Sequence, residues 1–353
     1  MFRFGFADPA APAQHAATAE AQAGTVTAAN EPAEEVPAKE GVPTGAQESV
    51  TVSPSLSLIK GVVSNAQAAS LLSDQRVASN DLIAGVYEGG FKTWEGSVDL
   101  AQYLATQVLG GKAQHAQRQG EQQAQPPAAE AQQQQQQQQQ QLDGPGDSAS
   151  SGFTLGPGSR VMELGCGSGL PGLVALWAGA EVHFQDYNRS VLTTLTIQNV
   201  AANASAWAVR GGTAGSGSPA GIADAASRAR FFAGSWDALP ALLEQQGLTH
   251  TYDLVLTAET IYSLEAIHSL YAAIKACLRP GSGAALVAAK SYYFGVGGGT
   301  AAFARLVAAD GCYDCSTVAV LDDGLSNKRE ILALTPRQDG GGADGASADG
   351  AAQ

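Results

Sequence analysis

The amino-acid sequence predicts an α/β fold with a mostly parallel β-sheet and helices on both of its faces. From residue 153 onward, short apolar runs typical of buried strands alternate with longer segments whose apolar residues recur at helical spacing. Glycine-rich or acidic motifs follow directly after several of these apolar runs. Alternating strands and helices form parallel sheets, and such sheets bind ligands beyond the carboxyl ends of their strands.

Seven strands are expected, each a short apolar run bounded by polar residues or glycine. In chain order they cover residues 159–164, 181–185, 230–233, 252–257, 284–290, 315–321 and 330–334. The first is apolar and ends at Gly165. The fourth and fifth are almost continuously apolar, which is typical of strands that are covered on both faces.

Helices are expected between the strands, over residues 170–178, 190–202, 239–246, 264–278 and 300–309. Pro171 is compatible with the first turn of the first helix, and Gly179, Gly247 and Pro280 mark three helix ends. A further amphipathic helix is expected upstream, over about 97–109, because apolar side chains recur there at helical spacing.

Low-complexity segments divide the chain. We expect residues 1–75 to be largely disordered, because residues 7–50 are mostly Ala, Pro, Glu, Gln and Gly and cannot offset the entropy of ordering. Residues 112–152 are a Gln-rich low-complexity insertion that contains a polyglutamine run. A disordered insertion at about 208–228 and a disordered tail at 337–353 are also expected. The folded core is therefore residues 153–336, joined by an N-terminal segment and helix at 76–111.

Charge and cysteine content narrow the possible partners. The formal net charge is −14, so the basic footprint of a nucleic-acid-binding protein is absent and no direct nucleic-acid contact is expected. No apolar run reaches membrane-spanning length, and no membrane association is expected. The four cysteines are scattered and no secretory signal is visible, which favours a reducing, intracellular compartment. Cys312 and Cys315 have zinc-like spacing but lack a second pair, so we expect no metal site.

The first predicted strand is followed by a glycine-rich motif. Glu163, Gly165, Gly167 and Gly169 bring the chain from the strand into a helix, whose free N–H groups can bind an anion such as a carboxylate. A dinucleotide-binding frame can be aligned on Gly167, Gly169 and Gly172. The alternative frame resembles the S-adenosylmethionine loop of seven-strand methyltransferases. Glu163 favours the second frame, because an acid there would repel a pyrophosphate but suits a ligand that carries an ammonium and a sulfonium.

Two further motifs end predicted strands where a nucleoside would bind. Asp186 ends the second strand, and a carboxylate at that position can accept hydrogen bonds from both ribose hydroxyls. The third strand ends in Gly234, Ser235 and Trp236, where the adenine would lie. Trp236 is equally compatible with a place in the core.

The fourth strand ends beside the expected reaction centre. It runs into Thr257, Ala258, Glu259 and, three residues on, Tyr262. A carboxylate followed by a phenol at this spacing can orient a nucleophile. The alternative interpretation of Glu259 is an acid that begins a helix.

The fifth strand opens into an unusual loop, residues 291–299, in which aromatic side chains directly precede glycines. Aromatic residues favour strands and cores, whereas clustered glycines favour turns where backbone passes close to another group. The combination predicts a loop shaped around a ligand or a partner.

Taken together, these motifs resemble the eukaryotic protein-histidine methyltransferases over about residues 76–335, apart from the two insertions. The resemblance is carried by the motifs at 86–95, 163–169, 183–188, 231–236, 257–262 and 290–299. It implies a seven-strand, Rossmann-like class I methyltransferase sheet, with residues 76–111 as a lid over S-adenosylmethionine. Family members usually have Ser where Ala258 stands and Pro where Gln198 stands.

The resemblance also implies the cofactor, the substrate and the site. The substrate would be a histidine of a large-subunit ribosomal protein, and the loop at 290–299 is the most specific motif, because relatives that methylate lysine lack it. The expected cofactor-binding residues are Trp94, Glu95, Glu163, Gly165, Gly167, Gly169, Asp186, Tyr187, Asn188, Gly234, Ser235, Trp236, Thr257 and Ala258.

An imidazole is largely neutral at cytosolic pH and needs no strong base before it attacks, so orientation should supply most of the acceleration. An acceptor for the second ring N–H would fix the tautomer. Glu259 is the first candidate for this catalytic role and Tyr262 the second. Tyr293, Phe294, Gly295 and Gly298 are expected to form the wall of the substrate slot, where the glycines would let a target backbone approach.

Three other functions stay open at this point. They are a lysine methyltransferase of the same superfamily, a nicotinamide-dependent oxidoreductase, and a non-catalytic factor that assists ribosome assembly. We expect a monomer that acts on a protein substrate in the cytoplasm and nucleus.

Overall fold

The computed structural model describes residues 32–42, 45–109, 153, 155–211, 222–322, 324 and 327–337. The expected Gln-rich insertion at 112–152 lies outside the described residues, as does all of the expected C-terminal tail except its first residue. Within the described part of the chain, no helix is both long and apolar enough to span a membrane.

The central sheet has eight strands in the order β1-β6-β5-β4-β7-β8-β10-β9. Their bounds are β1 (Glu34–Glu35), β4 (Arg160–Leu164), β5 (Glu181–Asp186), β6 (Ala229–Ala233), β7 (Leu254–Ala258), β8 (Ala284–Lys290), β9 (Tyr313–Leu321) and β10 (Arg329–Pro336). The five inner strands from β6 to β8 run parallel, and β1, β10 and β9 pair antiparallel. The predicted mostly parallel α/β sheet is confirmed.

The predicted count of seven strands is wrong, because β1 adds an eighth. It pairs Glu34 with Ala233 and Glu35 with Phe232, at the edge of the sheet. Beyond it, Val36 is buried and its N–H donates to the Phe231 carbonyl at 2.8 Å. A strand of two residues has no periodicity, so the sequence pattern could not show it.

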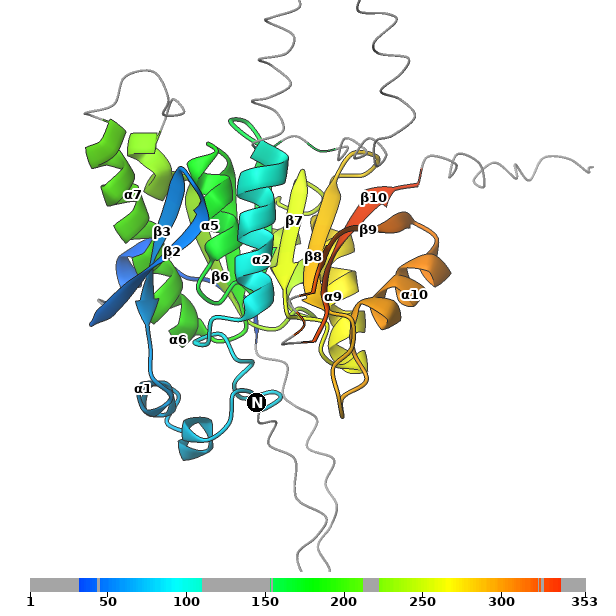
Figure 1. Ribbon diagram of the computed structural model, residues 1–353, viewed down its shortest axis with the longest axis horizontal. Coiled ribbons are helices and arrows are strands. Elements are labelled where there is room, and N and C mark those ends of the chain that lie inside the picture. Colours follow the sequence, from blue (N-terminus) through cyan, green and yellow to red (C-terminus); the bar gives the residue numbers. More distant parts are fainter. Residues whose placement is uncertain are drawn as a thin grey trace, which may run out of the picture.

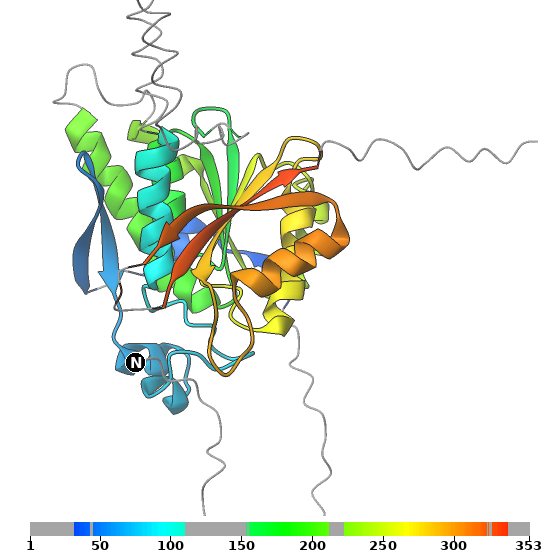
Figure 2. The ribbon, with the colours of Figure 1, turned by 45° about the vertical axis from the view of Figure 1, so that its right-hand side comes forward.

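Helices cover both faces of the sheet, as predicted. One face is covered by α2 (Glu95–Tyr103), α5 (Leu170–Trp177) and α7 (Ile197–Gly211), and the other by α8 (Leu239–Gln245), α9 (Leu264–Cys277) and α10 (Thr300–Asp310). Figure 2 shows the sheet between α2 on one side and α9 and α10 on the other. The strands alternate between the two layers: Leu254 and Leu256 contact the first core, and Val255 contacts the second.

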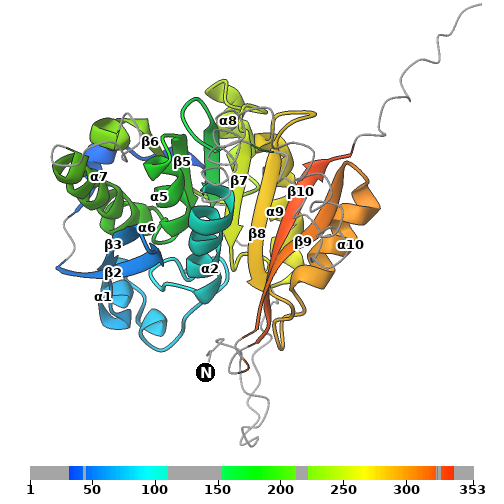
Figure 3. The ribbon, with the colours of Figure 1, turned by 45° about the horizontal axis from the view of Figure 1, so that its top comes forward.

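The expectation that residues 1–75 are largely disordered is wrong for its second half. Residues 46–62 form a hairpin of β2 (Ala46–Ser53) and β3 (Leu56–Val62), followed by α1 (Asn65–Leu71). The hairpin lies beside α7, as Figure 3 shows. Asn203 of α7 bonds both the N–H (2.9 Å) and the carbonyl (2.6 Å) of Ile59, and Asn199 accepts from the N–H of Gly61 at 2.7 Å. Tertiary contacts therefore order a segment whose composition alone predicts disorder.

Both ends of the segment expected to be disordered at about 208–228 are helical in the structure. Helix α7 continues to Gly211, and residues Ile222–Arg228 form the short helix η5, which buries Ala225 against the first core. The middle of the expected insertion, 212–221, lies outside the described residues. Helix α7 extends past the predicted end at 202 because Ala204 and Trp207 still face the core.

Candidate active site

A cavity of about 770 Å³ lies at the carboxyl ends of β4, β5, β6 and β7. Residues 82–94, here called the covering segment, form one of its walls. In Figure 1 this segment crosses the lower end of the molecule, where α2 begins. The predicted site residues that line the cavity are Trp94, Gly165, Gly167, Asp186, Tyr187, Gly234, Ser235, Trp236, Ala258, Glu259 and Tyr262. Their contact with a cofactor stays a prediction.

Nine predicted residues are not among those that line the cavity: Glu95, Glu163, Gly169, Asn188, Thr257, Tyr293, Phe294, Gly295 and Gly298. Most of them support neighbouring residues that do line it. Their positions separate the side chains that can touch a ligand from the side chains that shape the cavity.

The glycine-rich turn after β4 requires glycine at three positions. Gly165, Gly167 and Gly169 have φ values of 62°, 50° and 72°. A Cβ atom on Gly167 would lie 2.9 Å from the carbonyl oxygen of Gly90 in the covering segment. The turn therefore permits the close approach of two backbones that enclose the cavity.

Glu163 supports this turn from behind. Its carboxylate is buried and accepts from the N–H of Gly172 in the first turn of α5 at 2.8 Å. Burial raises the pKa of Glu163 well above its usual range. This hydrogen bond fixes the start of α5, and the expected role of Glu163 in binding a cationic ligand stays a prediction.

Asp186 joins the end of β5 to the glycine-rich turn. Its Oδ2 atom accepts from the N–H of Gly167 at 2.9 Å and its Oδ1 atom from the N–H of Asn188 at 3.1 Å. Burial raises the pKa of Asp186 to about 6, against the opposing effect of these hydrogen bonds. A carboxylate oxygen can accept two hydrogen bonds, so Asp186 retains capacity for ligand hydroxyls.

Gln185 is a site residue that sequence reasoning missed. Its Oε1 atom accepts from the indole of Trp236 at 2.9 Å and the N–H of Gly165 at 3.2 Å, while its Nε2 atom donates to the carbonyl of Gly234 at 2.8 Å. It thereby ties together the ends of β4, β5 and β6. A buried glutamine needs hydrogen-bond partners, so a polar residue within an apolar strand could have indicated that Gln185 holds the neighbouring loops together. Trp236 both lines the cavity and packs against the second core.

The covering segment is held by the residues that follow Asp186. The Tyr187 hydroxyl donates to the Gly85 carbonyl at 3.1 Å, and the Asn188 side chain donates to the Val86 carbonyl at 2.9 Å. Asn188 also accepts from the N–H of Glu88 at 3.3 Å. These bonds fix the covering segment over the carboxyl end of β5.

Trp94 and Glu95 lie at the junction of the covering segment with α2 and have different surroundings. Trp94 lines the cavity, and its indole N–H donates to the Gly89 carbonyl at 3.0 Å. Glu95 instead lies near Arg329 (3.4 Å) and Lys290 (3.9 Å). Glu95 therefore belongs to an ion-pair group that joins the start of α2 to β8 and β10.

The motif after β7 contains a strained residue. Glu259 has a φ of 59°, a value unusual for any residue other than glycine. Its carboxylate accepts from the N–H of Gly96 at 3.2 Å and from the hydroxyl of Tyr293. The side chain is 8% exposed, and burial raises its pKa. Such a backbone conformation persists only where the surroundings enforce it, and it is often found at functional sites.

Thr257 and Tyr262 flank this residue. Thr257 is fully buried, and its hydroxyl donates to the Leu164 carbonyl at 2.8 Å. Tyr262 lines the cavity, and its hydroxyl donates to the carboxylate of Glu88 in the covering segment. Glu88 was not among the predicted site residues.

The aromatic and glycine-rich loop has a different arrangement from the predicted substrate wall. Tyr293 is buried and bonds Glu259, whereas Phe294 is 72% exposed. The N–H of Gly298 donates to the Tyr262 carbonyl at 3.2 Å, and that of Gly299 to the Ile261 carbonyl at 2.9 Å. The close backbone approach that the glycines predicted is therefore an approach of the chain to itself.

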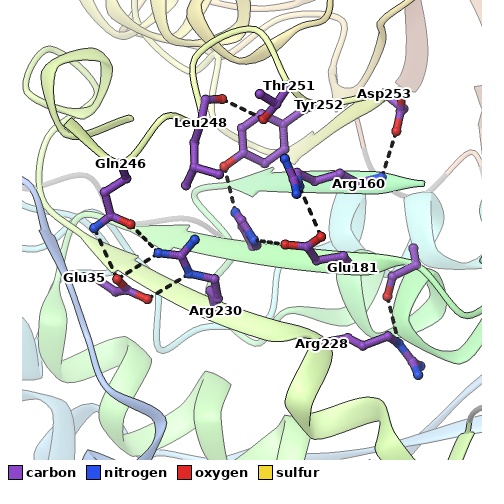
Figure 4. Close-up of polar contacts among 12 residues, drawn as sticks. Glu35, Arg160, Glu181, Arg228, Arg230, Gln246, Leu248, Thr251, Tyr252 and Asp253 are labelled. Atoms are coloured by element: carbon purple, nitrogen blue, oxygen red, sulfur yellow. Dashed lines mark hydrogen bonds and ion pairs between the residues drawn. The ribbon is translucent and has the colours of Figure 1, made fainter. Parts of the chain in front are cut away.

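A second, smaller hollow of about 360 Å³ lies near the amino ends of β4, β5 and β6. Figure 4 shows the polar contacts of its charged side chains. Arg230 binds Glu35 (2.9 Å), and Arg160 binds Glu181 (3.2 Å). Arg228 donates to the main-chain carbonyls of Leu176 in α5 (3.0 Å) and of Ala180 after it (3.2 Å). The charged side chains of this hollow are held by ion pairs or by main-chain carbonyls, so we place the candidate chemistry at the other end of the sheet.

The described residues contain no group of three or more His, Cys, Asp or Glu side chains that could hold a metal ion. The cavity instead combines one buried acid on β5, backbone N–H groups, an indole and a phenol–carboxylate pair. These groups suit an uncharged polar or cationic organic ligand.

The comparisons with known proteins point in one direction. The sequence matches no family model. It is 33% identical over 274 residues to a histidine protein methyltransferase 1 homolog of Rattus norvegicus, covering 75% of this chain and 62% of the rat protein. It is 32% identical over 255 residues to the corresponding homolog of Dictyostelium discoideum, covering 72% and 60%. The chain thus spans about three fifths of the length of these curated relatives.

Among solved structures, an arsenic(III) S-adenosylmethionine methyltransferase from Chlamydomonas reinhardtii aligns with a TM-score of 0.36 and 19% identity, over 56% of this chain and 69% of that one. Over three quarters of its length, the chain is a homologue of proteins named histidine protein methyltransferase 1.

Proposed function

We propose that this protein transfers a methyl group from S-adenosylmethionine to an imidazole nitrogen of a histidine in a protein substrate. The observation that carries the proposal is the sequence match to proteins named histidine protein methyltransferase 1. The cavity at the carboxyl ends of the parallel strands supports it, because this edge is where such sheets bind ligands.

The residues of the cavity fit S-adenosylmethionine. Asp186 can accept the ribose hydroxyls, and Trp236 offers an aromatic face beside the end of β6 for the adenine. Glu88, Asp237 and Glu265 also line the cavity, and their acidity suits a cationic ligand. When bound, the cofactor supplies an electrophilic methyl group on sulfur.

The substrate class follows from the family resemblance in the loop at 290–299. We propose that the substrate is a large-subunit ribosomal protein and that the enzyme acts as a monomer in the cytoplasm and nucleus, where such proteins are made and assembled. The exposed ring of Phe294, two residues before the cavity-lining Val296, supports a protein-sized substrate, because it offers an apolar contact outside the cavity.

The direct test incubates the full chain with methyl-labelled S-adenosylmethionine and purified large-subunit ribosomal proteins, and then analyses the hydrolysed amino acids. Labelled methylhistidine is expected. Labelled methyllysine would favour the lysine-specific alternative, and cofactor binding without any protein methylation would favour a non-catalytic assembly factor. Calorimetry with NAD in place of S-adenosylmethionine tests the oxidoreductase alternative.

Replacing Asp186 with asparagine should weaken cofactor binding by about 1–3 kcal/mol, since it removes a charged acceptor of hydrogen bonds. Wild-type affinity should also fall as the pH drops through about 6, because the ligand binds the ionised carboxyl and protonation then competes with binding. Calorimetry with S-adenosylhomocysteine between pH 5 and 7.5 measures both effects.

The asparagine variant should lose this pH dependence, and the exposed Asp224→Asn control should bind as the wild type does. Equal affinity in Asp186→Asn and wild type would refute the ribose assignment.

Replacing Phe294 with alanine should lower methylation of ribosomal protein by about 30-fold, which corresponds to about 2 kcal/mol for the loss of an aromatic contact in a recognition surface. Cofactor affinity should stay unchanged, because Phe294 does not line the cavity. Steady-state kinetics and calorimetry are measured on the same preparation.

Val209→Ala is the matched control, since Val209 is an equally exposed apolar residue on α7 (73% exposed). Wild-type methylation by Phe294→Ala would show that the aromatic ring has no part in substrate binding.

A further inference from the structure

The predicted acceptor for the second imidazole N–H is Glu259, but its surroundings do not suit that role. One carboxylate oxygen accepts from the N–H of Gly96 and the other from the hydroxyl of Tyr293. Each of these oxygens keeps a second lone pair, so it is burial that argues against the role: Glu259 is only 8% exposed, and a Cβ on Gly96 would lie 2.8 Å from its Oε1 atom. Glu259 therefore holds the start of α2 and the loop after β8 in place.

Glu88 is a second carboxylate in the cavity with a more open position. It lines the cavity wall formed by the covering segment and is only partly buried. Its Oε2 atom accepts from the hydroxyl of Tyr262, four residues after the end of β7, and its Oε1 atom accepts from the N–H of Gly85 at 2.7 Å. Asn188 fixes its main chain.

The hydrogen bonds leave Glu88 able to bind a further donor. Each carboxylate oxygen has two lone pairs, and among the described residues each oxygen accepts one hydrogen bond. Burial raises the pKa of Tyr262, so the phenol stays protonated and continues to donate to Glu88. The pair therefore presents a preoriented acceptor at the cavity surface, next to the strained turn that carries Glu259.

We propose that Glu88, positioned by Tyr262, binds the N–H of the target histidine and thereby selects which ring nitrogen is methylated. This inference rests on the proposed function. The ring nitrogen without hydrogen attacks with its lone pair and forms the new N–C bond. The bond between sulfur and the methyl carbon breaks, and its electron pair stays on sulfur. The proton of the other ring nitrogen then passes to the Glu88 carboxylate and from there to water.

The proposal explains why a carboxylate serves better than an amide at this position. A carboxylate only accepts, so it selects the one tautomer whose N–H faces it. An amide both donates and accepts, and could bind either tautomer. Glu88→Gln should therefore yield a mixture of the two methylhistidine isomers where the wild type yields one.

The experiment compares wild type with Glu88→Ala, Glu88→Gln and Tyr262→Phe, with the exposed Glu244→Gln on α8 as matched control. The probes are purified large-subunit ribosomal proteins with S-adenosylmethionine, and the readouts are kcat, KM and the isomer ratio of methylhistidine after hydrolysis. Glu88→Ala should lower kcat by a factor on the order of 100 or more, as for loss of a general base. Tyr262→Phe should cause a smaller loss and also shift the isomer ratio.

A binding readout complements activity. With S-adenosylhomocysteine present, the wild type should shift the imidazole C2–H resonance of N-acetylhistidine methylamide, and Glu88→Ala should abolish this shift. Calorimetry with S-adenosylhomocysteine and thermal melting follow the cofactor site and the fold in each variant.

The outcomes separate this inference from the proposed function. If the wild type produces no methylhistidine, the proposed function fails. If the wild type does produce it, but Glu88→Gln and Tyr262→Phe retain its kcat and its single isomer, the role of Glu88 is refuted. The variants could also lose activity only in proportion to their loss of cofactor affinity or thermal stability, with an unchanged isomer ratio. That result would likewise show that Glu88 is structural.

Discussion

Glu259→Ala is expected to lower the free energy of unfolding by at least about 2 kcal/mol and to abolish measurable methylation. The substitution leaves the N–H of Gly96 and the hydroxyl of Tyr293 without their acceptor, and an unsatisfied buried donor costs about 1–3 kcal/mol. These two donors belong to the start of α2 and to the loop after β8, so both would shift at the edge of the cavity. Denaturant unfolding and the methylation assay measure the two effects.

Glu259→Gln should have a stability and an activity between those of Glu259→Ala and the wild type. Its amide oxygen can still accept one of the two hydrogen bonds, whereas its NH2 group cannot accept from the Tyr293 hydroxyl. Glu244→Ala, an exposed glutamate on α8, is the control for the loss of a negative charge. If Glu259→Ala unfolds at the same denaturant concentration as the wild type, the two hydrogen bonds contribute nothing and the supporting role of Glu259 is wrong.

The sheet was predictable because the residue pattern that marks each strand lies within the strand itself. Each inner strand is an apolar run with alternate residues facing the two helical layers, as Leu254, Val255 and Leu256 illustrate. The hairpin β2–β3 was not predictable from composition, since the asparagines that bind its edge lie on α7, about 140 residues further along the chain. Strand β1 is too short to have a pattern at all.

The candidate site was predictable in position but not in detail. Motifs that end parallel strands meet at one edge of the sheet, so Gly165, Asp186 and Trp236 were expected near one another and line one cavity. Whether an acid lines the cavity or supports it depends on side-chain direction. Glu163 lies on the same face of β4 as Val161, toward α5, and this alternation was available as a signal.

The residues of the covering segment illustrate the limit of motif reasoning. Glu88 is brought to Tyr262 only by the path of the chain between α1 and α2, and the two are 174 positions apart. No local pattern encodes such a pairing. The aromatic and glycine-rich loop shows the same limit, because the need for close backbone approach was visible whereas its partner was not.

Gly298→Ala should destabilise the protein by about 3 kcal/mol, the upper end of the usual cost of overpacking. It should also lower the rate of methylation by a factor on the order of 100. A Cβ atom at this position would overlap the carbonyl groups of Ile261 and Tyr262, which are main-chain atoms and cannot move aside as a side-chain tip can. The overlap would push the loop away from Tyr262 and displace the phenol from Glu88. Thermal melting and steady-state kinetics measure the two effects.

Gly295→Ala is the matched control within the same loop. It has a φ of 84°, so alanine there is strained by about 1 kcal/mol, but no heavy atom lies within 4 Å of its Cβ position. Gly295→Ala should therefore melt only slightly below the wild type and retain most of its activity. The two variants add the same methyl group at positions three residues apart and differ in the atoms that the methyl group meets. Equal losses in both would show that loop flexibility, rather than packing of Gly298 on the Tyr262 backbone, determines activity.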